Sequence, residues 1–290
     1  MPEYRQCGVQ QVNERLLEQN PELRVRQREI ELECRRAIDE GVAQRVWRQL
    51  ITLPTVVHVV YSTDEENIPD EQVTTQIDVL NADYRATNPD RDQVPDPWQS
   101  LVADPNIQFE LVEITRTQTD RDSFGTNDTV KQASTGGVDP WPTDQYLNVW
   151  VCNLGGGLLG YAQFPGGPAE TDGVVILYTA FGTTGAAAEP FNLGRTATHE
   201  VGHWLNLRHI WGDRTDCTGT DEVSDTPRAQ MPNYGRPEWP HITCNNGPNG
   251  DMFMNYMDYV DDAAMFMFTH GQAARINATL AGPRSAIAGL

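Results

Sequence analysis

The chain contains 290 residues, of which 39% are hydrophobic, and its formal net charge at pH 7 is −20. This length is enough for one large domain with an extension, or for two modest domains. An acidic surface repels nucleic-acid phosphates, and the sequence has no apolar run of the roughly 18 residues that a membrane-spanning helix needs. We therefore expect neither nucleic acid nor a membrane as a partner.

The first fifty residues differ in character from the rest of the chain. Residues 1–48 contain nine arginines and nine acidic residues, so the remainder carries the whole net charge. Their apolar residues recur at loosely helical spacing, which predicts a charged helical extension. We expect residues 1–50 to form one unit and residues 51–290 a second one.

After the extension, the hydrophobic pattern predicts strands that alternate with helices. We expect strands over residues 55–61, 107–114, 146–152 and 174–178, a hairpin-like segment over 155–167, and helices over about fifteen residues from residue 69, over 192–207 and over 269–280. The stretch 212–250 is rich in Gly, Pro and Asn, which predicts irregular structure. The mixture indicates an α+β fold.

The most informative motif is His199-Glu200-Val201-Gly202-His203. Residues four apart lie on one face of a helix, so the two imidazoles can share one Zn²⁺ ion. Glu200 projects about 100° round the helix from His199, a direction that suits a water molecule held on the metal better than the metal itself. The spacing therefore predicts two zinc ligands with Glu200 as the general base.

A third histidine, His209, follows six residues after His203. A continuing helix would turn its side chain away from the metal, so the helix has to end between them. Asn206 stands where the break is needed, and asparagine tolerates the left-handed backbone conformation better than any residue except glycine. A chance match on an ordinary amphipathic helix is the alternative, and the third histidine at this offset argues against it.

The five cysteines indicate at least one free or specially engaged thiol. Cys217 and Cys244 enclose a loop-rich stretch that would gain from a cross-link, so we expect a disulfide and an oxidising compartment outside the cell. Two buried, unpaired thiols are the alternative. Cys152 lies in an apolar run and is expected to be a buried strand residue.

Three further motifs accompany the zinc motif: Met254-Asn255-Tyr256-Met257-Asp258-Tyr259, Arg5-Gln6-Cys7-Gly8, and the ending His209-Ile210-Trp211-Gly212-Asp213. Together they resemble the metzincin metalloproteases, and within them the pappalysin family in its small microbial branch of ulilysin- and mirolysin-like proenzymes. The resemblance covers residues 52–290 well and the extension only through the motif around Cys7. One departure is Asn206, where most such proteins have glycine.

The resemblance implies a fold and a division of the chain. A twisted, mostly parallel sheet would carry backing and active-site helices above the cleft, in an upper subdomain that ends at about residue 209. An irregular lower subdomain over residues 210–290 would be closed by a C-terminal helix. Residues 1–50 would be an inhibitory pro-segment.

The resemblance also assigns roles to single residues. Cys7 would occupy the open zinc position in the latent form as a cysteine switch, with Arg5 paired to an acid. Tyr259 would stabilise the oxyanion through its hydroxyl, with a buried aromatic as the alternative. Met257 would pack beneath the metal without touching it.

The acidic loop over residues 216–226 lacks the spacing of an EF-hand. The resemblance implies that it binds Ca²⁺ through Asp221, the carbonyl of Val223, and Thr226, and a solvated acidic loop is the alternative. Asp262 follows the Met257 turn, and the resemblance implies that it lines the pocket for the residue after the cut. A carboxylate there favours a basic side chain.

These observations predict a secreted zinc endopeptidase that cuts peptide and protein substrates before Arg or Lys. The enzyme would be held latent by its own pro-segment and activated by autoproteolysis or another protease near Arg45–Arg48. The alternative is a non-catalytic zinc-containing binding module. The presence of Glu200 and the unfilled fourth ligand position argue against it.

Overall fold

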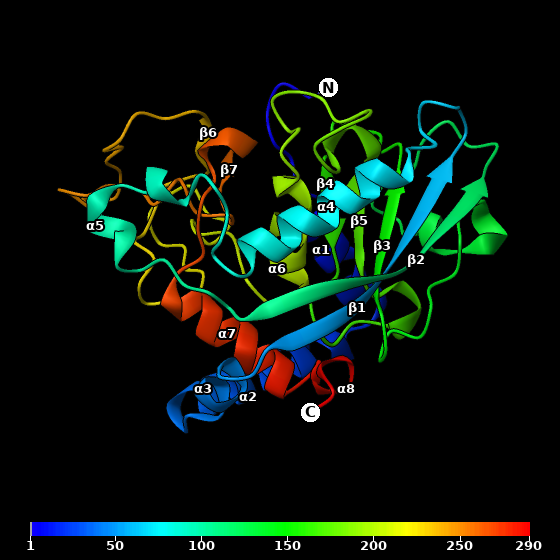
Figure 1. Cartoon of the computed structure of the whole chain (residues 1–290). Coiled ribbons are helices and arrows are strands. Elements are labelled where there is room, and N and C mark those ends of the chain that lie inside the picture. The colour runs from blue at the N-terminus through cyan, green and yellow to red at the C-terminus, as the bar shows by residue number, and fades with distance from the viewer. Residues whose placement is uncertain (1) are drawn as a thin grey trace.

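The structure is a computed structural model that describes residues 2–290. A five-stranded sheet of order β2-β1-β3-β5-β4 forms its centre, and all neighbouring strands run parallel except β4, which is antiparallel to β5 (Figure 1). The strands are β1 (Ile51–Tyr61), β2 (Ile107–Gln118), β3 (Leu147–Cys152), β4 (Gly160–Ala162) and β5 (Val174–Leu177). The α+β fold with a mostly parallel sheet is therefore confirmed.

The inner strands of the sheet are buried on both faces, whereas the edge strand β2 is largely exposed. Every residue of β3 and β5 is buried, including Cys152, as expected for parallel strands covered by helices on each side. Helices α4 (Asp70–Asp83) and α6 (Arg195–Trp204) lie on one face, while α1 (Val9–Gln19) packs against β4 (Figure 1). Strand β1 begins at residue 51, four residues before the predicted start, because it continues to pair with the beginning of β2.

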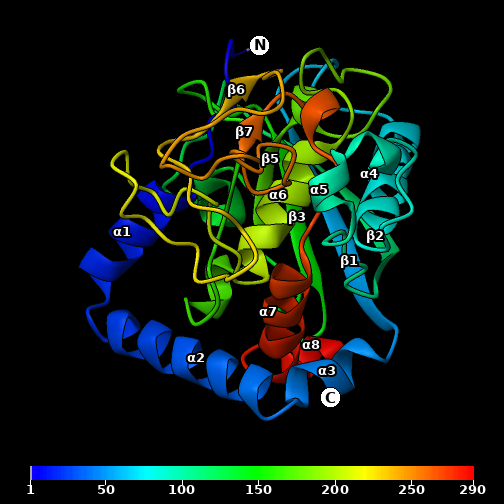
Figure 2. The same cartoon turned by 90° about the vertical axis from the view of Figure 1, so that its left-hand side faces the viewer.

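The extension forms three helices, as its apolar spacing predicted: α1, α2 (Glu22–Asp39) and α3 (Val42–Trp47). Helices α2 and α3 pack against α7 (His270–Ala281), so the extension follows the body from the rim strand β4 to the far end of α7 (Figure 2). The remaining short helices are α5 (Asp96–Gln99) and α8 (Ser285–Ala288).

A buried ion-pair cluster holds α1 on the body. Arg15 pairs with Asp128, whose other oxygen lies 2.9 Å from Nζ of Lys131, the only lysine of the chain. The Lys131 amine is fully buried, donates to the carbonyl of Thr171 at 2.6 Å and faces the rings of two aromatic residues. The carboxylate, the carbonyl and the two rings together stabilise the charge of the buried Lys131 amine.

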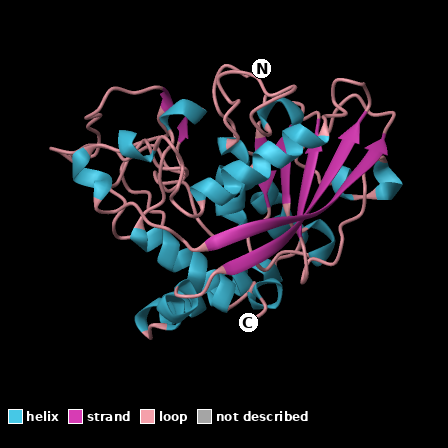
Figure 3. Cartoon of the chain, viewed as in Figure 1, coloured by secondary structure: helices cyan, strands magenta, loops and turns pink. Residues whose placement is uncertain are grey.

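The region between α6 and α7 has little regular structure (Figure 3). Its two short strands, β6 (Tyr234–Gly235) and β7 (Tyr259–Val260), pair in parallel, and a disulfide joins Cys217 to Cys244 as predicted. Over residues 2–290, no helix is long and apolar enough to cross a bilayer.

Candidate active site

Helix α6 presents the central motif and is shorter than predicted by three residues at each end. It begins after Gly194, whose φ of +76° is left-handed, and the Asp262 carboxylate accepts hydrogen bonds from the backbone N–H groups of Leu193 and Arg195 there. A carboxylate at a helix N-terminus satisfies free N–H groups and complements the helix dipole. This contact comes from a segment 67 residues away, so the local sequence does not reveal it.

The helix ends at Trp204, and the turn that follows is the one predicted at Asn206. Asn206 has φ of +72°, and the N–H of Leu207 donates to the carbonyl of Gly202 at 2.9 Å. This left-handed residue reverses the chain, so that His209 returns towards the helix face that carries His199 and His203.

The three imidazoles meet at their Nε2 atoms. Nε2 of His203 lies 3.1 Å from Nε2 of His199 and 3.1 Å from Nε2 of His209. Each Nδ1 has its own acceptor. His199 faces the Tyr256 carbonyl at 2.7 Å and His203 the Leu207 carbonyl at 2.8 Å. His209 faces Oδ1 of Asp213 at 2.5 Å. Such partners fix the ring orientation and leave the Nε2 lone pairs free for a metal.

The spacing of these nitrogens fits a zinc ion. Tetrahedral ligands at about 2.0–2.1 Å from Zn²⁺ lie about 3.3 Å from one another, close to the separation seen here. Burial lowers the pKa of His199 and of His203 well below the ordinary value, which favours the neutral form that binds metals. Asp213, the partner of His209, was part of a quoted motif but had no predicted role. Its position four residues after His209 was the available signal.

The segment around Cys7 enters this centre and pairs with β4 through a single parallel bridge between Cys7 and Gly160. The N–H of Gly8 donates to the Gly160 carbonyl at 2.8 Å, and the N–H of Leu159 donates to the Gln6 carbonyl at 2.9 Å. The Cys7 thiol donates to Glu200 Oε2 at 3.3 Å, and its sulfur and the histidine ligand nitrogens all lie within 4.8 Å of one another. The predicted four-ligand set is therefore brought together.

Glycine is required on both sides of this strand pair. A Cβ atom on Gly8 would lie 2.8 Å from Cγ2 of Thr126, and one on Gly160 would lie 2.9 Å from both Cγ of Glu200 and the Val175 carbonyl oxygen. Gly8 belongs to the motif around Cys7, but Gly160 was not singled out by its sequence. Its importance arises from a contact with a helix forty residues further along the chain.

Glu200 lies beside the metal position and is fully buried. Burial raises its pKa to about 8, although the hydrogen bond from Cys7 and the charge of Arg5 act in the opposite direction. Tyr259 packs against the same centre, with its ring centroid 4.9 Å from that of His209 and 5.7 Å from that of His199. Both predicted catalytic residues thus border the histidine cluster.

Arg5 occupies the position predicted to select substrates. Its Nη2 lies 2.6 Å from Oδ1 of Asp262, and both side chains are buried. Nε and Nη1 donate to the Val260 carbonyl and to the Thr196 hydroxyl, each at 3.1 Å. The guanidinium also stacks over Phe191, with 5.1 Å to the ring centroid. The acid expected to pair with Arg5 is therefore Asp262, the residue expected to face basic substrate side chains.

Beneath the centre, Met257 is fully buried and supports α6. A Cβ atom on Gly202 would lie 2.5 Å from its sulfur, so the helix and the turn are in direct contact at this glycine. This is the packing position predicted for Met257.

The residues predicted to bind calcium also lie together. Oδ2 of Asp221 accepts the Thr226 hydroxyl at 2.7 Å, and that hydroxyl lies 3.1 Å from the Val223 carbonyl. Burial raises the pKa of Asp221 to about 7, although hydrogen bonds from Thr226 and Val223 act to lower it.

A buried three-histidine centre with an adjacent glutamate, carried on a mostly parallel sheet, defines a metzincin-type metalloprotease. A sequence profile of the Peptidase_M43 family, described as pregnancy-associated plasma protein-A, matches residues 130–281. The chain belongs to this family, the pappalysins, and is a metalloendopeptidase. The alternative of a non-catalytic zinc module is thereby set aside.

Relatives and solved structures agree with this assignment. An extracellular metalloprotease of Arthroderma otae is 35% identical over 234 residues, which cover 78% of this chain and 76% of the relative. A promirolysin mutant of Tannerella forsythia is 41% identical with a TM-score of 0.87 and covers 98% of this chain and 97% of its own. Mature mirolysin of Tannerella forsythia with a cleaved peptide is 45% identical with a TM-score of 0.79, covering 82% of this chain and 97% of its own.

Proposed function

We propose that the chain is the latent form of a zinc endopeptidase, in which residues 1–50 are the inhibitory pro-segment and residues 51–290 the catalytic domain, with its upper part ending at about residue 209. The observation that carries this proposal is the meeting of three Nε2 atoms with the Cys7 sulfur and the Glu200 carboxylate. His199, His203 and His209 would hold the zinc ion. When bound, zinc supplies Lewis acidity and lowers the pKa of a bound water molecule.

The residues around the ion divide the work of peptide hydrolysis. Glu200 takes a proton from the attacking water and later gives it to the leaving amine, and its burial keeps it close to the reacting groups. The Tyr259 hydroxyl stabilises the negative charge that develops on the carbonyl oxygen. Asp213 and the carbonyls of Tyr256 and Leu207 hold the three imidazoles in position.

Latency follows from what the pro-segment occupies. Cys7 stands as the fourth ligand and excludes water, while residues 6–8 pair with the rim strand at which an extended peptide would add. The Arg5–Asp262 pair fills the position for the residue after the cut. Since Asp262 already accepts a buried guanidinium, the enzyme is expected to cut before Arg or Lys, with Arg preferred for its planar fork.

Activation is expected to remove this segment by a cut before Arg45 or Arg48. Both arginines are exposed, but Arg45 lies inside α3, whereas Arg48 follows its last residue and begins an exposed stretch of three residues. Proteases act preferentially on exposed segments outside helices, so Arg48 is the better site. The lengths of the solved relatives support this boundary: mature mirolysin covers 82% of this chain and promirolysin 98%.

Two further features complete the proposal. The 216–226 loop binds Ca²⁺ through Asp221, the Val223 carbonyl and Thr226, whose oxygens lie close together. The enzyme acts outside the cell on peptides and proteins with basic residues. The disulfide and the extracellular relatives support this location.

The decisive experiment combines elemental analysis with the Glu200→Ala variant. Glu200 is not a ligand in this scheme, so the variant is expected to keep about one zinc ion per chain while peptide hydrolysis after activation falls by several orders of magnitude. Asp213→Ala serves as a matched control, because it removes the partner of a zinc ligand and should lower the zinc content of the chain. Loss of zinc from Glu200→Ala, or hydrolysis at the parent rate, would overturn the assignment of roles.

A further inference from the structure

A second contact between extension and body lies beside Asn206, after the end of α6, whereas Asp262 lies at the start of that helix. Glu31 on α2 reaches Arg275 on α7, with Oε1 2.9 Å from Nη1 and Oε2 2.5 Å from Nη2. This is a two-point contact between a carboxylate and a guanidinium, the geometry for which arginine is best suited. A second arginine, Arg208, lies 3.8 Å from the same carboxylate.

The arginine side of this contact belongs to the catalytic body, which also provides a hydrogen-bond partner for Arg275. Arg275 is only 2% exposed, and its Nε donates to the Asn206 carbonyl at 2.7 Å. Asn206 is the left-handed residue that returns the chain towards His209. The guanidinium is therefore fixed by the turn that shapes the metal site, with its two remaining nitrogens directed at Glu31.

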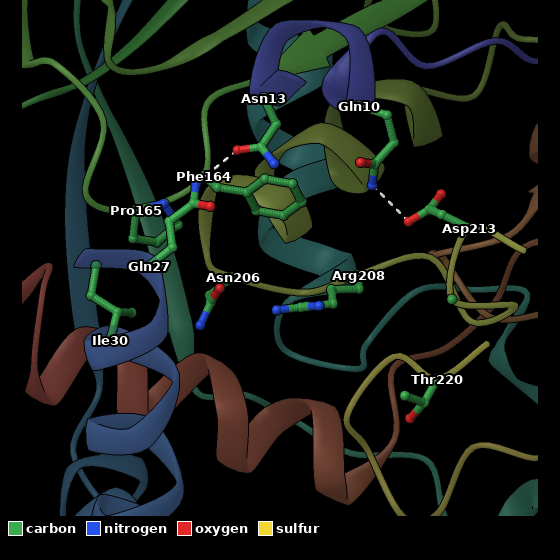
Figure 4. A pocket seen from close by; sticks show the side chains of 11 residues that line it. Gln10, Asn13, Gln27, Ile30, Phe164, Pro165, Asn206, Arg208, Asp213 and Thr220 are labelled. Carbon is green, nitrogen blue, oxygen red and sulfur yellow. Dashed lines mark hydrogen bonds between the residues drawn. The ribbon is translucent and has the colours of Figure 1, made fainter. Parts of the chain in front are cut away.

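The surroundings leave this pair of arginines accessible once α2 is absent. Arg208 borders a hollow of about 260 Å³ between the extension and the body, where Gln27 and Ile30 of α2 form the opposite wall (Figure 4). Glu222 of the body pairs with Arg35, which lies one turn beyond Glu31 on the same helix. Release of α2 removes the carboxylate that both arginines face and opens their guanidinium groups to another ligand.

We propose that Arg275 and Arg208 form a carboxylate-binding site of the catalytic body, which Glu31 fills in the latent form and which an acidic group of a peptide fills in the active form. The second half rests on the proposed release of the pro-segment. The first half is a property of the full-length chain. The ligand class is a carboxylate, since the planar fork of the guanidinium matches two coplanar oxygens.

The site can be tested in the full-length chain by chemical rescue. Glu31→Ala removes one carbon and a carboxylate, the atoms of acetate. The variant is expected to melt roughly 5–10 °C below the parent, and acetate is expected to restore a large part of that difference when compared with chloride at equal ionic strength. Glu33 is an exposed glutamate on the same helix, so Glu33→Ala is the matched control. Its melting temperature should not differ between acetate and chloride.

An acetate effect on Glu31→Ala no larger than that on Glu33→Ala would overturn the site. If Glu31→Ala does not fold, the activated parent chain replaces it, with N-acetyl-glutamate amide and N-acetyl-glutamine amide as probes. Only the glutamate compound should raise the melting temperature, and Arg208→Ala should reduce that shift. Equal shifts would refute the proposal. A chain that cannot be activated counts against the proposed function and leaves the acetate result standing.

Discussion

The front and the rear of the extension use different physical means to bind the same body. The front, from Arg5 to Gly8, is a short segment outside any helix, and its Arg5 and Cys7 side chains enter the catalytic centre itself. The rear, from α1 to α3, is helical and packs on the outside through apolar residues and ion pairs such as Glu31–Arg275. In the proposed latent form, inhibition would rest mainly on the front and anchoring mainly on the rear.

The largest expected effect concerns the pocket that the front occupies. Asp262→Asn removes the charge but keeps an oxygen that can accept from the N–H groups at the start of α6. In the activated enzyme, the preference for Arg after the cut is expected to fall by roughly 10²–10³-fold in kcat/KM, because a buried charge pair contributes about 2–5 kcal/mol. Peptide libraries measure this directly. Asp261→Asn, at the neighbouring position, should keep the preference. An unchanged preference in Asp262→Asn would show that Asp262 does not select the residue after the cut.

The next effect concerns the thiol of the front. Full-length Cys7→Ala leaves the metal position open to water while Arg5 and the rear helices remain bound. Its hydrolysis of a small peptide is expected to exceed that of the uncut parent by on the order of tenfold, or about 1.4 kcal/mol. Cys34→Ala, which alters a buried thiol at the rear, is the control. If Cys7→Ala is as inactive as the parent, the bulk of the segment causes latency and the thiol does not.

The ion pair between Glu31 and Arg275 at the rear should respond to acid. Burial acts to raise the pKa of Glu31, but hydrogen bonds and charge from Arg275, with Arg208 and Arg35, lower it to about 2. A carboxylate whose pKa is lower in the folded than in the unfolded chain stabilises the fold at pH values above the unfolded pKa of about 4.3. That stabilisation is lost as the pH falls towards the folded pKa of about 2. Allowing for partial solvent exposure, the parent should exceed Glu31→Gln by about 1–2 kcal/mol in free energy of unfolding at pH 6.

That difference should narrow steadily between pH 4.5 and pH 2.5 in urea unfolding of the two chains. A constant difference across this range would mean that Glu31 contributes through packing and not through its charge.

The smallest effect concerns the loop that the rear touches through Arg35 and Glu222. Removal of Ca²⁺ by a chelator that spares zinc is expected to lower the melting temperature by a few degrees, since an ion bound only to the folded state stabilises it. Asp221→Asn should remove the response, whereas Asp216→Asn, at an exposed position, should retain it. An unchanged melt in the parent would identify the loop as a solvated acidic segment.

The sequence predicted the parts of the site that depend on local spacing. The helix with His199 and His203, its break at Asn206, and the pairing of Cys217 with Cys244 each follow from residues close together or of unmistakable chemistry. The bounds of that helix were too wide, because a carboxylate from Asp262 and a left-handed Gly194 fix its start.

Features that depend on distant contacts were missed. The need for glycine at position 160 arises from Glu200 and Val175, which only the folded sheet brings near it. The Glu31–Arg275 pair joins residues 244 positions apart. No periodicity or motif marks such pairs, because each partner is an ordinary charged residue on an amphipathic helix until the tertiary structure places them together.

The buried amine of Lys131 has a practical consequence for chemistry on this protein. Because the chain has one lysine and its Nζ is enclosed by Asp128, the Thr171 carbonyl and two aromatic rings, reagents that acylate amines should leave the folded body unmodified. Arg15 of the extension closes the same cluster from outside. A single acylation at residue 131, detected by mass spectrometry, would therefore report the opening of the ion-pair cluster formed by Arg15, Asp128 and Lys131.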